Sequence, residues 1–129
     1  MKILIIDDDQ DVINVTSMFL REGGHEVEAE LDFKKALPRI EAVRPDLLVL
    51  DVMFPGDSTA GFQLARDIRA KHEKLPILMV TSVNREGSVR FSNKDIDENW
   101  LPISEFVEKP IKRQRLLELV DRLVKSSPR

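Results

Sequence analysis

Residues 3–11 read ILIIDDDQD, in which four consecutive apolar side chains are followed by four carboxylates within five positions. A short segment that is apolar at every position is typical of a strand inside a parallel sheet, because helices cover both faces of such a sheet. Carboxylates placed side by side repel one another, so they need solvent or a cation around them. The stretch therefore predicts a buried strand at residues 3–6 that ends at an acidic site.

Further apolar segments follow at residues 27–31, 47–50, 77–80 and 106–107. Those at 47–50 and 77–80 are apolar throughout and fit central strands, whereas HEVEAEL (25–31) alternates and fits an edge strand with one solvent-facing side. Amphipathic helical patterns separate these strands, with apolar stripes at residues 11–22, 36–43, 62–68 and 116–124. Strand and helix thus alternate, which predicts a doubly wound α/β fold around a five-stranded parallel sheet.

Two of these helices carry local signals. The first is expected to end at Gly23 and Gly24 and to turn one apolar side toward the sheet: Val12, Val15, Phe19 and Leu20. In the second, Asp32 is a candidate N-cap. Pro38 lacks an amide donor, so it is expected to kink this helix or to delay its start.

The segment between the fourth and fifth strands, residues 82–105, fits no regular pattern. Its apolar residues keep neither a helical nor a strand period, and Gly87 and Pro102 interrupt it. We expect a short or irregular helix around residues 96–101 within a long loop.

Composition limits the classes of function. A chain of 129 residues fits one domain, which we assign to residues 1–124, with a polar tail at 125–129. The net charge of −3 provides no basic field for nucleic acid or anionic lipid, and there are no cysteines for disulfides or thiolate sites. No apolar stretch is long enough to span a membrane. We expect a cytoplasmic protein without direct DNA binding or membrane association, and we expect His25 and His72 to be solvated.

Polar residues follow four of the predicted strands: Asp7 and Asp8, Asp51, Thr81, and Lys109. In open α/β sheets, ligands bind beyond the carboxyl ends of the strands. Carboxylates about 4 Å apart repel by about 4 kcal/mol per pair at an effective dielectric of about 20, so a cluster of them needs a cation. Hard oxygen ligands without His or Cys favour Mg²⁺. Mg²⁺, a carboxylate nucleophile, a hydroxyl and a lysine together suit phosphoryl transfer.

The ordered set IIDD, LLVLDVMFP, LMVTS and FVEKP resembles the receiver domain of bacterial two-component response regulators. The resemblance covers nearly the whole chain. It implies the flavodoxin-like receiver fold with strand order 2-1-3-4-5, of a stand-alone, single-domain type. The loop after Asp51 and the interval from Thr81 to Lys109 are both longer than is usual in the family, so the fourth-helix region is expected to be atypical.

The resemblance also implies roles at the acidic site. Asp51 would be the phospho-acceptor and a Mg²⁺ ligand, with Asp8 binding the ion directly and Asp7 helping through water. Met53 would contribute its backbone carbonyl. Asp9 and Asp11, in contrast, are expected to favour the N-terminus of the first helix through its dipole rather than to bind metal.

Two further positions take family roles in signalling. Thr81 would bond a phosphoryl oxygen and, together with Phe106, act as a switch, while Lys109 would pair with another phosphoryl oxygen. The implied partners are a sensor histidine kinase or a histidine phosphotransfer protein, and a downstream protein target; a homodimer is possible. Such a domain catalyses its own phosphorylation and dephosphorylation but is not expected to turn over a separate substrate.

Two other classes of function stay open. The spacing of Asp7 and Asp9 also fits a small Mg²⁺-dependent phosphatase with an aspartate nucleophile, although the order of Asp51, Thr81 and Lys109 does not match that family. The altered loops would also suit a degenerate receiver that acts only as a binding module.

Overall fold

The computed structural model describes residues 1–51, 59–82, 105–109 and 111–126, with side chains at 1–50, 63–80 and 111–125. In this part of the chain, five parallel strands form one sheet in the order β2-β1-β3-β4-β5. Their bounds are β1 (Lys2–Ile6), β2 (Glu26–Glu30), β3 (Leu47–Asp51), β4 (Ile77–Ser82) and β5 (Glu105–Lys109). The predicted sheet and its strand order are confirmed.

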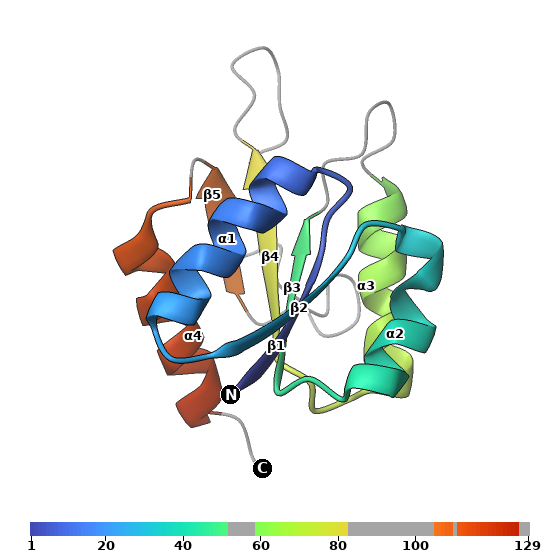
Figure 1. Ribbon diagram of the computed structural model, residues 1–129. Helices are drawn as coiled ribbons and strands as arrows, with labels where there is room; N and C mark the ends of the chain where they lie inside the picture. The colour runs from blue at the N-terminus through green and yellow to red at the C-terminus, as the bar shows by residue number, and fades with distance from the viewer. Residues whose placement is uncertain (52–58, 83–104, 110, 127–129) are drawn as a thin grey trace.

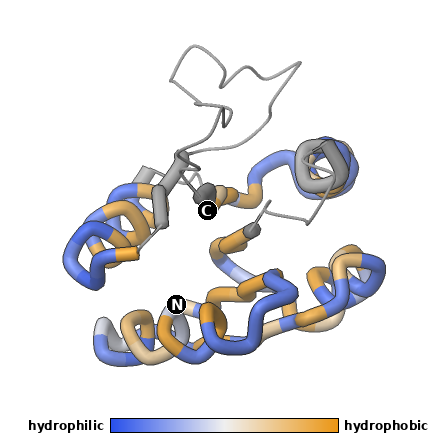
Figure 2. Tube along the Cα trace, turned by 90° about the horizontal axis from the view of Figure 1, so that it is seen from above, coloured by the Kyte–Doolittle hydropathy of each residue, from blue (hydrophilic) through white to orange (hydrophobic). Residues whose placement is uncertain are grey.

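Helices cover both faces of this sheet (Figure 1). Helices α1 (Gln10–Glu22) and α4 (Arg113–Ser126) lie on one face, and α2 (Ala36–Val43) and α3 (Thr59–Lys71) lie on the other. Figure 2, which looks along the sheet from above, shows it enclosed between these two layers. The doubly wound α/β architecture is therefore confirmed.

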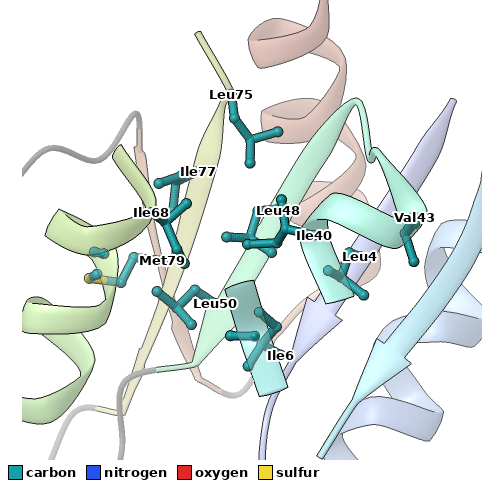
Figure 3. Packing of buried hydrophobic residues seen from close by; sticks show 12 residues of the cluster. Leu4, Ile6, Ile40, Val43, Leu48, Leu50, Ile68, Leu75, Ile77 and Met79 are labelled. Carbon is teal, nitrogen blue, oxygen red and sulfur yellow. The ribbon is translucent and has the colours of Figure 1, made fainter. Parts of the chain in front are cut away.

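The two helical layers explain why the central strands are apolar at every position. Successive side chains of a strand point to opposite faces. In β1, Leu4 and Ile6 pack in the cluster under α2 and α3 (Figure 3), while Ile3 and Ile5 pack in the cluster under α1 and α4. All four are at most 1% exposed. Burial of each such side chain contributes about 1.5–3 kcal/mol to the free energy of unfolding.

Strand β2 alternates because it lies at the edge of the sheet. Its Val27 and Ala29 pack against the α1 and α4 layer. Glu28 and Glu30 face the other way and pair with Arg39 of α2, at 3.6 and 3.9 Å between nitrogen and carboxylate oxygen. The predicted edge strand with one polar side is confirmed.

The predicted buried side of α1 is partly wrong. Leu20 is buried as expected, but Val15 is 45% exposed, and the helix buries three residues that were not predicted: Ile13, Thr16 and Ser17. Residues 12, 15 and 19 and residues 13, 16, 17 and 20 both repeat at helical spacing. Hydrophobicity alone favours the first row, because the second contains Thr16 and Ser17. Thr16 and Ser17 are small, and small side chains at a contact allow close packing of a helix, which favours that orientation.

The start of α2 follows one of its two local signals. Asp32 does not cap α2 as predicted: it caps the preceding 3₁₀ turn, Phe33–Lys35, by accepting the N–H of Lys34 at 2.9 Å. The N-cap of α2 is Lys35, which makes no side-chain capping bond. Helix α2 begins only at Ala36, so Pro38 falls in the first turn, where the amide would have no helical partner. The expectation that Pro38 delays the helix is confirmed.

The last helix follows its predicted apolar side, with Leu116, Leu119, Val120 and Leu123 all buried. It continues through Ser126, into the segment that we assigned to the tail. The irregular helix expected around residues 96–101, like most of the atypical segment, lies outside the described residues. Within the described residues, no helix combines the length and the apolar character needed to cross a membrane.

Candidate functional site

The acidic residues of β1 and β3 meet at the carboxyl edge of the sheet. Strand β1 ends at Ile6, directly before Asp7, and Asp51 is the last residue of β3. Ile6 pairs with Leu50, so Asp7 and Asp51 follow at the same level on adjacent parallel strands. Adjacent strands lie about 4.8 Å apart. The backbone therefore brings together two predicted site residues that are far apart in the sequence.

The polar positions of β4 and β5 lie at the same edge. Asp51 pairs with Val80, so Thr81 is one residue further along the neighbouring strand. Lys109 is the last residue of β5 and pairs with Ser82. The backbones of Asp51, Thr81 and Lys109 thus occupy three successive strand ends, while their side chains and all of Met53 lie outside the described part of the structure.

Asp7 is held in place by bonds from two sides. Its main-chain N–H donates to the carbonyl oxygen of Glu30 at 3.1 Å, and its Oδ1 accepts the N–H of Asp9 at 2.9 Å. The residue is only 1% exposed. Burial of a carboxylate is costly unless hydrogen bonds or a counter-charge compensate it, so these bonds matter for its position. Asp8, in contrast, is exposed to solvent.

Asp9 begins helix α1. Its Oδ1 accepts the N–H groups of Asp11 at 2.9 Å and of Val12 at 3.4 Å, and Asp11 lies in the first turn. The expectation that both acids support the helix N-terminus is confirmed. Sequence reasoning missed that Asp9 also binds Asp7 through its backbone. The D-x-D spacing carried that signal, because Asp side chains often accept the N–H two residues on.

The donor set at this edge fits a hard divalent cation. Asp7 and Asp8 offer carboxylate oxygens, and both histidines lie at the opposite edge, where His25 precedes β2 and His72 precedes β4. Oxygen ligands without imidazole suit Mg²⁺. Among the described side chains, no group of three potential metal ligands lies close together. The side chain of Asp51 is not among the described ones, so the predicted set of Mg²⁺ ligands stays a prediction.

The expectation that both histidines are solvated is partly wrong, because each is only partly exposed. Nδ1 of His25 and Nε2 of His72 are buried and have no hydrogen-bond partner within the described structure. Burial lowers the pKa of His25 below its usual value of 6.5; the N-terminal ammonium lowers it further, and Asp121 opposes this shift. Sequence reasoning could not see this burial, because it arises where separate elements pack together.

A groove of about 790 Å³ lies far from the acidic edge, between the ends of α2 and α3. Arg44 and Pro45 line one side, and Lys71 and His72 line the other. Cations are favoured at helix C-termini by the helix dipole, which accounts for Arg44 and Lys71 without a ligand. The predicted chemistry and this groove therefore lie at opposite edges of the sheet, and the strand ends are the better candidate site.

Comparisons with known proteins agree with this geometry. A family model described as the response regulator receiver domain matches residues 3–121. The chain is 32% identical over 128 residues to the regulatory protein VanRB of Enterococcus faecalis, which covers 98% of this chain and 54% of that protein. It is 36% identical over 118 residues to the response regulator MprA of Mycobacterium avium, with 91% and 50% covered. It thus spans about half the length of these curated relatives.

Among solved structures, the fold is similar to the crystal structure of the receiver domain of NtrX from Brucella abortus. The two superpose with a TM-score of 0.79 at 28% sequence identity, and the match covers 97% of this chain and 99% of that one.

Proposed function

The chain belongs to the response regulator receiver domain family of two-component signalling, and on that premise we propose that Asp51 accepts a phosphoryl group from a partner phosphohistidine. A sensor histidine kinase or a histidine phosphotransfer protein would be the donor. The observation that carries the proposal is the register that sets Asp51 level with the preformed Asp7. We expect the exchange in the cytoplasm.

The proposed chemistry divides among the strand ends. The Asp51 carboxylate attacks phosphorus, an O–P bond forms, and the N–P bond to the donor imidazole breaks. The Thr81 hydroxyl donates to one phosphoryl oxygen and the Lys109 ammonium pairs with another. The strand register supports these roles. Thr81 on β4 lies one residue beyond the position paired with Asp51, and Lys109 on β5 lies two residues beyond it.

Mg²⁺ would be held by Asp7, Asp8, Asp51 and the backbone carbonyl of Met53. When bound, the ion neutralises charge on the phosphoryl oxygens. Asp7 supports this assignment, because its backbone is bonded to Glu30 and its buried carboxylate accepts the N–H of Asp9 before a ligand arrives. Catalysis in such a site is mostly positioning and charge stabilisation rather than covalent chemistry by extra groups.

Output would follow from a switch between β4 and β5. Phe106 pairs in register with Met79, two residues before Thr81, so the two proposed switch positions lie on adjacent strands. Thr81 itself pairs with Glu108, so Phe106 is the diagonal neighbour of Thr81, two residues back on the adjacent strand. We propose that the phosphorylated form is read by a downstream protein or by a second copy of the chain.

Incubation with acetyl phosphate and Mg²⁺, followed by intact mass measurement, tests the proposal. We expect one phosphoryl adduct in the wild type and none in Asp51→Asn. Asp46→Asn is the matched control, because Asp46 precedes the same strand at its other end and bonds the N–H of Lys2 at 2.9 Å. No adduct on the wild type would favour a binding-only receiver, and turnover of a generic phosphate ester would favour a phosphatase.

A further inference from the structure

We propose that Asp9 is a positioning residue for the divalent cation of the acidic edge, acting through Asp7. This inference rests on the proposed function, because it assumes that Asp7 is part of the Mg²⁺ site. It adds a residue that neither acts as a metal ligand nor touches the phosphoryl group.

Asp9 bonds both the first turn of α1 and the side chain of Asp7, and it uses a different group for each. Its side-chain Oδ1 accepts the N–H of Asp11 at 2.9 Å and so fixes the first turn of α1. Its own backbone N–H donates to Oδ1 of Asp7 at 2.9 Å. The residue is in an extended conformation, with φ −102° and ψ 110°, as an N-cap requires. The capped helix therefore determines where the N–H that binds Asp7 lies.

Asp7 is restrained through both its backbone and its side chain. Its backbone is already bonded to Glu30 at the end of the β1 and β2 ladder. The Asp9 N–H contributes to the restraint on rotation of the carboxylate. Asp8 is exposed, so of these two carboxylates the buried Asp7 is the one whose orientation the fold controls. Partners that orient metal ligands commonly change metal affinity by 10- to 100-fold when they are lost.

Two simpler roles for Asp9 would give different results. If Asp9 contributes only negative charge to the site, removal of the charge alone weakens Mg²⁺ binding. If it contributes only to helix stability, Mg²⁺ binding does not depend on it. Asp9→Asn distinguishes the charge role from positioning, because the amide oxygen keeps the N-cap acceptor while the charge is removed. Asp9→Ala removes both.

The experiment is a calorimetric titration of Mg²⁺ into the wild type and the Asp9 variants, with the free energy of unfolding measured in parallel. We expect Asp9→Ala to weaken Mg²⁺ binding roughly 10-fold. Asp9→Asn and Asp9→Ser, which both place a neutral N-cap at this position, should keep affinity within about twofold of the wild type.

Asp32→Ala is the matched control. Asp32 is also an N-cap, bonded to the N–H of Lys34, and it lies in a different turn from Asp7. The substitution should lower stability and leave Mg²⁺ affinity unchanged. The positioning role would be overturned if Asp9→Ala bound Mg²⁺ with wild-type affinity, or if Asp9→Ala and Asp9→Asn lost equal affinity. Either result would leave the metal site of the proposed function standing. A wild-type protein that binds no Mg²⁺ would instead overturn the metal site of the proposed function, and the inference with it.

Discussion

The N–H of Asp7 donates to the carbonyl oxygen of Glu30 at 3.1 Å, one residue beyond the last pair of β1 and β2, Ile6 and Glu30. This bond extends the ladder past the apolar part of β1. It carries Asp7 to the level of Asp51 while the backbone is still anchored to the sheet. A flexible loop at this point would lose entropy when it ordered around a cation, whereas the extended ladder is ordered already.

Lys109 provides a test of the phosphoryl site that does not remove the acceptor. Lys109→Ala should keep the fold but slow phosphorylation of Asp51 by about 10²- to 10³-fold, because a group that stabilises charge in the transition state is lost. The rate of adduct formation with acetyl phosphate measures this effect. Lys112→Ala, at an exposed position just before α4, is the control and should react like the wild type. An unchanged rate in Lys109→Ala would contradict the assigned role.

His25 should make stability depend on pH. Its pKa is lowered in the folded state, mainly by burial, so above pH 6.5 both folded and unfolded states hold the neutral ring and the group contributes no pH dependence. As the pH falls below 6.5, the unfolded state binds the proton more readily, and stability decreases until the folded-state pKa is passed. Urea unfolding at several pH values in this range measures how steeply the free energy of unfolding changes with pH.

The slope is assigned by comparing variants. His25→Gln cannot take up this proton, so its stability should fall less between neutral and mildly acidic pH than that of the wild type. His72→Gln keeps His25 and is the control for loss of a partly buried imidazole. Equal slopes in the wild type and His25→Gln would show that other groups cause the pH dependence.

Arg44 ends α2 in the left-handed conformation, with φ 52°. Side chains with a Cβ are strained there, whereas glycine is not, although glycine loses more entropy on folding. We expect Arg44→Gly to raise the free energy of unfolding by about 0.5–1 kcal/mol. Arg44→Ala keeps the strained Cβ and should not share the gain; chemical denaturation of both variants distinguishes strain from loss of the charge.

Local patterns were enough to predict the architecture. The strand at residues 3–6 is apolar throughout because it is covered on both faces, and HEVEAEL alternates because only one of its faces is covered. Pro38 predicted the late start of the second helix, since a proline acts on its own turn, whereas Asp32 caps the 3₁₀ turn before that helix. The strand ends that carry the candidate site followed from the same patterns, because all parallel strands end at one edge.

The sequence by itself thus determined that the fold contains a parallel sheet and at which edge of the sheet chemistry is expected. The order of the strands followed from the family resemblance. Only the tertiary structure decided which side of α1 is buried, because Val15 and Ile13 satisfy the same periodicity and the choice depends on packing between elements. It also decided that the N–H of Asp9 bonds the carboxylate of Asp7 and that Nδ1 of His25 is buried. Orientation and burial depend on residues that are distant in sequence, and no local pattern records those contacts.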